Sequence, residues 1–255
     1  MRRLLAPALS LLVTACAWGP ERELQEVRRF HPGSDQLATV YSRWAEPDGT
    51  FVKDGEAHAW YADGTPRLEA RYVSDQPDGT WLEWFDNGQV QRRGAYVVGK
   101  KQGEWTEFTA AGTLLERTHW NNGRMDGPVE MFDEQGHAVL TGNFVFGRRD
   151  GEWTCFYPNG QMRLRGRYER GVPKLRWTAW YSNGQRLGEG SYRDGVRDGL
   201  WVRFDDEGQV QAKCRFVNDV PVGQVEELSA ASEAGPIGSD PFDFAGFVDQ
   251  AFARP

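Results

Sequence analysis

The chain has 255 residues, enough for one large domain or two small ones, and 39% of its residues are apolar. Few aliphatic residues beside 30 Gly and 11 Trp favour turn-rich β-structure over a helical core. The net charge of −7, with no Lys/Arg tract, argues against nucleic acid as a partner, because phosphates require a basic surface.

Residues 1–15 have the pattern of a signal peptide. Two arginines precede an apolar run that ends in small residues and is too short to span a bilayer permanently. The ending V-T-A-C at Cys16 resembles a bacterial lipobox, which implies cleavage before Cys16 and lipidation of its thiol. Ala17, in place of Asp, favours the outer membrane by analogy with Gram-negative sorting. The alternative is ordinary secretion with a coincidental cysteine.

Two short segments follow before any regular pattern begins. Residues 16–36 are interpreted as a tether in which Leu24, Val27 and Phe30 form at most a short amphipathic turn. Residues 37–53 are interpreted as two strands that do not keep the later spacing. Because the open end of a repeat array needs an atypical unit to cover it, we expect residues 37–53 to be an N-terminal cap.

From residue 54 to about residue 228, a 24-residue pattern recurs without insertion, in seven units and a partial eighth. The units begin at Asp54, Asp78, Gln102, Asp126, Asp150, Lys174 and Asp198. Counted from offset 0, offset 1 is Gly except at Leu175, and offset 3 is Trp in five units. Offset 10 is Gly and offsets 6 and 18 are aromatic in all seven units.

The dipeptide at offsets 9 and 10, such as Asn159-Gly160, predicts a two-residue hairpin turn with two positive φ angles. Paired residues then have offsets that sum to 19, so Trp153 lies opposite Gly166. A ring can lie over a strand glycine and cover its bare backbone, so we expect Trp153 to cover Gly166. A turn with an odd number of residues would move every side chain to the other face.

This register assigns two faces to the sheet. Offsets 3, 5, 7, 12, 14, 16 and 18 share the face that we expect to be the core, including apolar residues at offset 12 such as Met162. The other face carries the offset-6 aromatic row beside arginines such as Arg163 and Arg165. This row is the candidate binding surface for a sugar, a peptide or a protein, partly through cation–π contacts. It consists of Trp60, Trp84, Phe108, Phe132, Phe156, Trp180 and Phe204. The alternative is that these rings form half of a two-sided core.

The predicted fold class is all-β. Seven hairpins give about fourteen antiparallel strands, which extend for ~67 Å at ~4.8 Å per strand. Such a sheet must twist or coil to bury its tryptophan face. We expect an elongated array of tandem 24-residue hairpins, with caps at both ends, rather than a compact sandwich.

The units resemble the MORN-variant repeat (membrane occupation and recognition nexus, bacterial second type). The features that carry the resemblance are D-G-x-W-x-x-[FY]-x-x-N-G and G-x-Y-x-x-G, clearest in residues 78–101, 150–173 and 198–221. Arrays of this kind are often labelled YwqK-family antitoxins of toxin–antitoxin systems. The resemblance implies a β-hairpin repeat fold and a protein- or lipid-interaction role, with no catalytic residues.

The residues outside this pattern give little sign of catalysis or metal binding. Cys155 and Cys214 lie five strand steps, or ~24 Å, apart, so we expect buried fillers and no disulfide. The four histidines lack the spacing of a metal site, and the repeated Asp-Gly is interpreted as turn chemistry rather than a calcium ligand. We predict no enzyme activity, no cofactor and no metal.

Residues 229–255 depart from the repeat. A small, polar linker is followed by Asp240-Pro241, a helix start, and by apolar residues at helical spacing. The amphipathic segment either caps the last open strand or docks on a partner.

These patterns predict an exported, lipid-anchored envelope protein whose array binds a protein or glycan partner. One alternative is an antitoxin-like or immunity protein that neutralises a toxin, and another is a structural spacer. The sequence does not determine the oligomeric state.

Overall fold

The computed structural model describes residues 23–227, and every helix or strand in that range is a β-strand. Cys16 with its signal peptide, and the linker and amphipathic segment of residues 229–255, lie outside the described residues. The strands are β1 (Gln25–Phe30), β2 (Leu37–Ala45), β3 (Phe51–Trp60), β4 (Pro66–Val73), β5 (Gln76–Pro77), β6 (Gly79–Trp84), β7 (Val90–Val97), β8 (Lys100–Phe108), β9 (Leu114–Asn121), β10 (Arg124–Phe132), β11 (Ala138–Val145), β12 (Arg148–Arg149), β13 (Gly151–Phe156), β14 (Met162–Glu169), β15 (Val172–Trp180), β16 (Arg186–Arg193), β17 (Val196–Arg197), β18 (Gly199–Phe204), β19 (Val210–Val217) and β20 (Val220–Glu227).

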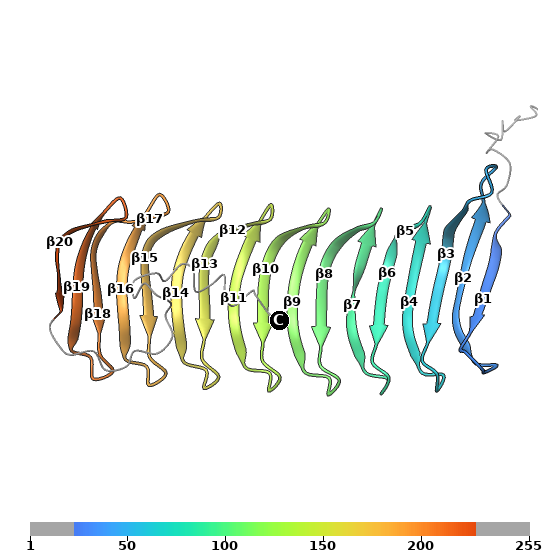
Figure 1. Cartoon of the computed structure of the whole chain (residues 1–255), viewed down its shortest axis with the longest axis horizontal. Helices are drawn as coiled ribbons and strands as arrows, with labels where there is room; N and C mark the ends of the chain where they lie inside the picture. The colour runs from blue at the N-terminus through green and yellow to red at the C-terminus, as the bar shows by residue number, and fades with distance from the viewer. Residues whose placement is uncertain (1–22, 228–255) are drawn as a thin grey trace, which may run out of the picture.

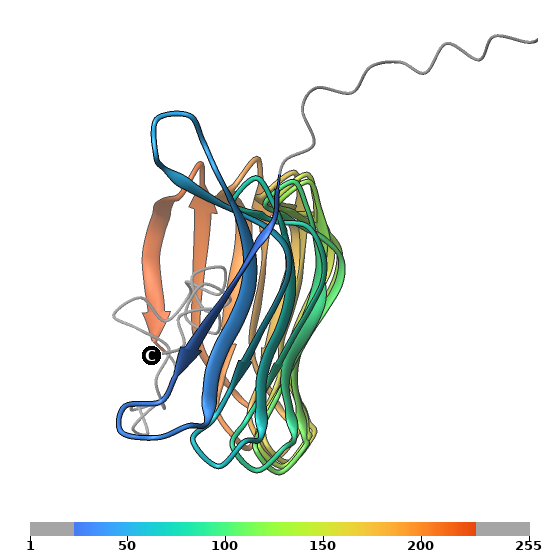
Figure 2. The ribbon, with the colours of Figure 1, turned by 90° about the vertical axis from the view of Figure 1, so that its right-hand side faces the viewer.

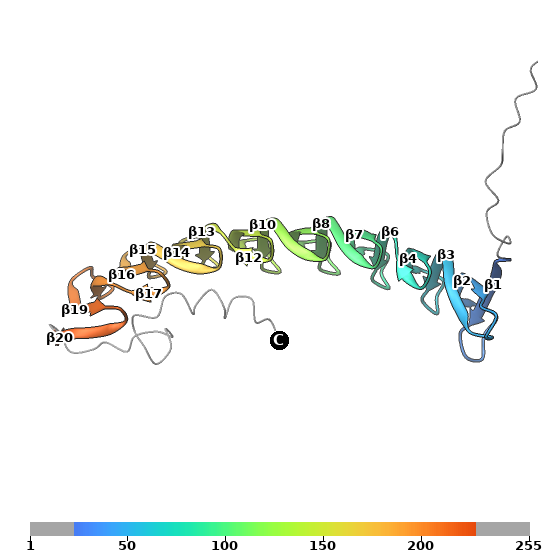
Figure 3. The ribbon, with the colours of Figure 1, turned by 90° about the horizontal axis from the view of Figure 1, so that it is seen from above.

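The strands form one long antiparallel sheet in which neighbours in sequence are neighbours in space (Figure 1). Seen end-on, the strands curve along their length, and seen from above the row bends at its two ends (Figures 2 and 3). The sheet is not closed into a barrel. This confirms the predicted all-β, elongated array of tandem hairpins.

The N-terminal end differs from the predicted tether, because residues 25–30 form β1. This strand pairs with β2, placing Val27 opposite Tyr41, and its turn is closed by His31 N donating to Gln36 O (2.9 Å). His31 Nε2 also lies 3.1 Å from Trp60 O, which matches the bond from Tyr61 Oη to Trp84 O (2.8 Å) one unit later. Residues 25–45 therefore form a divergent hairpin that continues the array, because β2 pairs in turn with β3.

The hairpin turns have three residues rather than two. In the unit that starts at Asp150, Tyr157 N donates to Gln161 O (2.9 Å) and Gly160 N donates to Tyr157 O (2.9 Å). Gly160 has a φ of +79°, so residues 158–160 form a type I turn followed by a glycine bulge. The prediction of two-residue turns at these positions is wrong.

Asparagine serves a different purpose in these turns. Asn159 Oδ1 accepts a hydrogen bond from Gln161 N (3.1 Å), and its Nδ2 donates to Ser182 O (2.7 Å) in the next unit's turn. Asn87 makes the equivalent bond to Ala110 O (2.7 Å). The amide therefore ties neighbouring turns together, which a carboxylate cannot do because it has no donor.

A second bulge restores the predicted register. Phe156 pairs with Met162, whereas Cys155 pairs with Leu164, so Arg163 is an extra residue in β14. Beyond this point Trp153 is the Cα partner of Gly166, as predicted. The same shift occurs in all seven hairpins. Met162 therefore pairs with the opposite-face row and is 37% exposed, so its assignment to the core face was wrong.

The core follows the tryptophan face, but each ring covers the preceding hairpin rather than its own. A Cβ added to Gly166 would lie 2.0 Å from the Trp177 ring, and one added to Gly142 would lie 2.4 Å from Trp153. The prediction that Trp153 covers Gly166 is therefore wrong, because the ring that covers Gly166 is that of Trp177. The side chain leans across the boundary between units, so the Trp–Gly contact joins one hairpin to the next.

Aromatic rings at offset 18 complete this core. Tyr168 lies between Trp153 and Trp177, with ring centres 6.1 and 5.1 Å away and both contacts edge-to-face. The alternation continues through Tyr192 to Trp201, with edge-to-face contacts that each contribute ~0.5–1.5 kcal/mol beyond area burial. The result is a ladder of rings that runs along the sheet.

Candidate binding surfaces

The predicted aromatic row lies on the face opposite the tryptophan ladder. All seven rings, from Trp60 to Phe204, are half-buried, so each keeps part of its surface open to solvent. The row recurs once per hairpin, at intervals of two strands or ~10 Å. The structure thus brings all seven residues into one line along the array.

Arginines stack on part of this row. The guanidinium carbon of Arg165 lies 5.8 Å from the Trp180 ring centre, and that of Arg93 lies 5.5 Å from Phe108. In both cases the arginine belongs to the unit before the ring. Arg163 instead lies 5.4 Å from the Tyr157 ring in its own hairpin.

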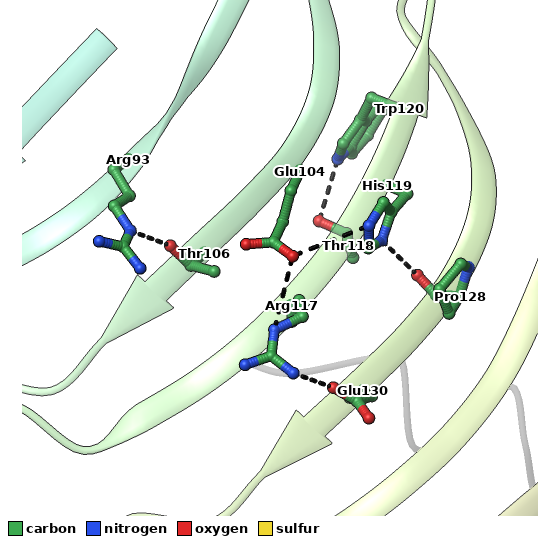
Figure 4. A network of polar contacts seen from close by, with 9 residues as sticks. All are labelled: Arg93, Glu104, Thr106, Arg117, Thr118, His119, Trp120, Pro128 and Glu130. Carbon is green, nitrogen blue, oxygen red and sulfur yellow. Dashed lines mark hydrogen bonds and ion pairs between the residues drawn. The ribbon is translucent and has the colours of Figure 1, made fainter. Parts of the chain in front are cut away.

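A polar network covers the same face at the middle of the array (Figure 4). Arg117 bridges Glu130 (2.6 Å) and Glu104 (3.8 Å), and His119 Nε2 lies 3.8 Å from Glu104. His119 Nδ1 is 3.3 Å from Pro128 O. Side chains this exposed form ion pairs worth at most ~1 kcal/mol, so the network is a polar surface more than a source of stability.

The Asp-Gly pair that opens most units shapes the sheet edge. Asp150 Oδ2 accepts a hydrogen bond from Arg170 N (3.0 Å), and Asp78 Oδ2 accepts one from Val98 N (3.0 Å). The glycine that follows supplies a positive φ, as at Gly151 (+82°). The carboxylates are thus engaged by turn backbone. Across residues 23–227, no group of three or more His, Cys, Asp or Glu is arranged to hold a metal.

The ladder face also carries cations at a two-unit period: Lys53, Lys101, Arg149 and Arg197. Lys101 Nζ lies 4.4 Å from the Trp105 ring centre and 4.6 Å from that of Trp120. Arg149 similarly spans Trp153 (5.3 Å) and Tyr168 (5.4 Å). Burial lowers the pKa of the Lys101 ammonium, and the nearby Arg92 acts in the same direction.

One stretch of the ladder face departs from the apolar packing that the predicted core face implies. Offsets 5 and 14 pair across each hairpin and are apolar at Met131/Leu140 and Cys155/Leu164. In the two units that start at residues 78 and 102, the same positions are Glu83/Arg92 and Glu107/Glu116. Comparing these two columns between units is the sequence signal that finds them.

Neither of the two described cysteines forms a disulfide, and both are buried, as predicted. Burial raises the pKa of the Cys155 thiol to about 11, so it stays protonated and unreactive at neutral pH. No helix among residues 23–227 is long and apolar enough to cross a membrane.

These features define an all-β protein built from tandem hairpins in a single sheet. Three stretches match the family model of the MORN repeat variant: residues 77–97, 149–170 and 197–218. These three stretches are therefore similar to the MORN repeat variant, as the motifs predicted. No curated protein matches its sequence.

Among solved structures, the crystal structure of TcdB2-TccC3-Cdc42 is 10% identical, with a TM-score of 0.15 over 83% of this chain and 15% of that chain. A protein of unknown function from Bacteroides fragilis is 8% identical, with a TM-score of 0.13 over 77% and 94% of the two chains. The Photorhabdus luminescens Tc holotoxin pore is 8% identical, with a TM-score of 0.16 over 76% and 13%. The chain thus corresponds to about 15% of the length of the first of these structures.

Proposed function

We propose that this protein is a non-enzymatic scaffold that binds a protein or glycan partner along its repeat array. The observation that carries the proposal is the row of half-buried rings from Trp60 to Phe204, which repeats once per hairpin on the face opposite the core ladder. Partly exposed rings beside arginines suit flat sugar faces, peptide side chains and protein surfaces. A ligand that extends along the array would contact several units at once, and this adds avidity.

The test uses the intact protein as bait in cross-linked cell envelopes. Trp84→Leu with Trp180→Leu removes two flat rings while keeping apolar volume, so the fold should survive. Recovery of the partner should fall several-fold in this variant. Leu115→Ala truncates an apolar side chain at the extra residue of the bulge in another hairpin and serves as the control. Equal recovery by all three proteins would contradict a binding role for the row.

The identity of the captured partner separates the alternatives. A single toxin recovered at one-to-one stoichiometry would favour an immunity protein of the kind that the antitoxin label suggests. An export signal conflicts with a cytoplasmic toxin, so that partner would have to act in the periplasm. Recovery of no partner would favour a structural spacer.

We also propose that Cys16 carries a lipid that anchors the protein in a bacterial membrane, and that the protein is sorted to the outer membrane. The lipobox-like ending at Cys16 and the residue after it motivate this proposal. Cys16→Ser should move the protein from the membrane to the soluble fraction. The control is Cys155→Ala, because the next unit has alanine, Ala179, at the same offset. This variant should stay in the membrane fraction. Retention of Cys16→Ser in membranes would contradict the anchor.

A further inference from the structure

The aromatic ladder is buried to different depths along the array, although its rings keep the same offsets. At offset 18, Tyr72 and Tyr96 are half-buried, whereas Tyr168, Tyr192 and Phe216 are at most 7% exposed. The tryptophans at offset 3 change in the same direction, from the half-buried Trp81 to the fully buried Trp153, Trp177 and Trp201. The repeat alone does not explain this difference, because equivalent rings have equivalent neighbours in the sheet.

Contacts between the rings do not account for the difference. Tyr96 lies between Trp81 and Trp105, with ring centres 5.2 and 4.9 Å away. Trp105 lies under Lys101 and is itself buried. Tyr168 has the equivalent pair of neighbours at 6.1 and 5.1 Å, yet it is buried and Tyr96 is not. Curvature does not account for it either, because the row of strands bends at both ends and the rings near the N-terminal end stay half-buried (Figure 3).

The side chains between the rings also change along the array. Offsets 5 and 14 form a charged row in the units that start at residues 78 and 102: Glu83, Arg92, Glu107 and Glu116. In the next three units these offsets hold apolar or small residues, all of them buried: Met131/Leu140, Cys155/Leu164 and Ala179/Gly188. Every described strand belongs to one sheet, so residues 23–227 supply no second layer over these side chains. The ladder face from Met131 to Phe216 therefore needs a cover from outside these residues.

Residues 240–252 have the sequence pattern that such a cover requires. Their apolar residues recur at positions i, i+3, i+4, i+7 and i+8, which places them in one stripe along a helix: Phe244, Phe247, Val248, Ala251 and Phe252. Asp243 and Asp249 lie outside this stripe. An apolar stripe suits the apolar part of the ladder face and not the charged row, because burying charges beneath apolar side chains is unfavourable.

The segment is also long enough to lie over this part of the face. β20 ends at Glu227, eight strand steps or ~38 Å from Met131 on β10. Residues 228–239 span up to ~40 Å when extended, and a helix over residues 240–252 adds ~20 Å. The apolar stripe can therefore reach any part of the ladder face between β10 and β19.

We propose that residues 240–252 form an amphipathic helix whose apolar stripe packs on the ladder face of the last units, over the rings from Trp153 to Phe216. The helix then covers one face of the sheet rather than the open edge of β20, and it completes the core as a second layer. The aromatic row from Trp60 to Phe204 lies on the opposite face, so this inference is independent of the proposed scaffold function.

The test is hydroxyl-radical footprinting of the full chain, which measures by mass spectrometry how accessible each tyrosine side chain is to solvent. We expect Tyr168 to be oxidised several-fold more slowly than Tyr96. Phe244→Ser with Phe247→Ser and Phe252→Ser removes the apolar stripe. This triple variant should raise the oxidation of Tyr168 several-fold and leave that of Tyr96 unchanged.

The matched control is Asp243→Ser with Asp249→Ser, which changes the polar side of the same segment. This control should keep Tyr168 as protected as in the wild type. Protection of Tyr168 that survives in the triple serine variant would overturn the proposal, because the cover would then not be the stripe.

A photocrosslink keeps the proposal testable if the triple serine variant fails to fold. A benzophenone side chain placed at position 247 of the full chain should crosslink to residues 126–217 of the same chain. Crosslinks to a second copy, to another protein or to residues before 126, or no crosslink at all, would overturn the proposal.

Discussion

Leu175 occupies offset 1, where each of the other six units has glycine. The position needs a left-handed backbone, with φ of +82° at Gly151 and +58° at Leu175. A left-handed residue with a Cβ costs ~1–2 kcal/mol, and the Leu175 side chain is 62% exposed, so packing offsets little of this. The side chain therefore introduces strain at the sheet edge without joining the core.

We predict that Leu175→Gly stabilises the protein by ~0.5–1 kcal/mol. The relief of left-handed strain exceeds the entropy that glycine adds to the unfolded chain. Urea denaturation followed by tryptophan fluorescence measures the difference. Gly151→Ala, the reverse change at the same offset, should destabilise by a similar amount. A loss of stability in Leu175→Gly would show that this side chain contributes packing that outweighs the strain.

At the scale of the strand pair, the packing unit spans two neighbouring hairpins. Each offset-3 tryptophan covers the offset-16 residue of the preceding unit, as Trp177 covers Gly166 and Trp201 covers Gly190. Where Val129 replaces tryptophan, the covered residue is Thr118. The small residue is thus required only where a ring follows.

We predict that Gly166→Thr alone destabilises by ~1–3 kcal/mol, because its Cβ would lie 2.0 Å from the Trp177 ring. Combining it with Trp177→Val recreates the natural Thr118/Val129 pair and should cost less than the sum of the single changes. Denaturant titration of the four proteins gives the coupling energy. Gly166→Thr with Trp153→Val is the control and should show little coupling. Strong coupling to Trp153 instead would restore the within-hairpin contact.

The sequence predicted the pairing of Trp153 with Gly166 correctly but assigned the ring-over-glycine contact to the wrong pair of residues, and the reason can be identified. The pairing of Trp153 with Gly166 follows from backbone register, which the 24-residue period and the turn position determine. The lean of a ring toward one neighbouring strand does not follow from register. Yet Thr118 followed by Val129 already distinguishes the two options, because the within-hairpin assignment leaves Trp105 opposite Thr118 and Val129 opposite Gly142.

The turn prediction reached the right register through two errors that cancel. A three-residue turn adds one residue to the loop, and the bulge at Arg163 adds one more to β14, so the faces are the same as for a two-residue turn. Bulges leave little trace in a single sequence, because the extra residue is of ordinary type. The charged row from Glu83 to Glu116 could be predicted from the sequence, since these charged residues stand at offsets 5 and 14, which the register assigns to the core face.

At the scale of the whole molecule, stability should be a sum over units and over the interfaces between them, because the main contacts of each hairpin within residues 23–227 are with its neighbours. Removing one unit then shortens the array without abolishing the fold. The loss of stability depends on which two units the deletion brings into contact. The Trp–Gly contact across each boundary makes that dependence specific to the site of deletion.

We predict different outcomes for two deletions of equal length. Deleting residues 150–173 joins Arg149 to Lys174 and places Gly142 beneath Trp177, so the usual ring-over-glycine contact forms again. Deleting residues 102–125 joins Lys101 to Asp126 and places Gly94 beneath Val129, where no ring covers the glycine. The second protein should be less stable than the first by ~2–4 kcal/mol, the cost of a missing large side chain in a core. Thermal and urea melts of both proteins measure this difference.

Adding Val129→Trp to the second deletion should recover most of the lost stability, since the new ring can lie over Gly94 as Trp105 does in the intact chain. Equal stability of the two deletions, or no recovery by Val129→Trp, would mean that the interfaces between units do not depend on the ring-over-glycine contact.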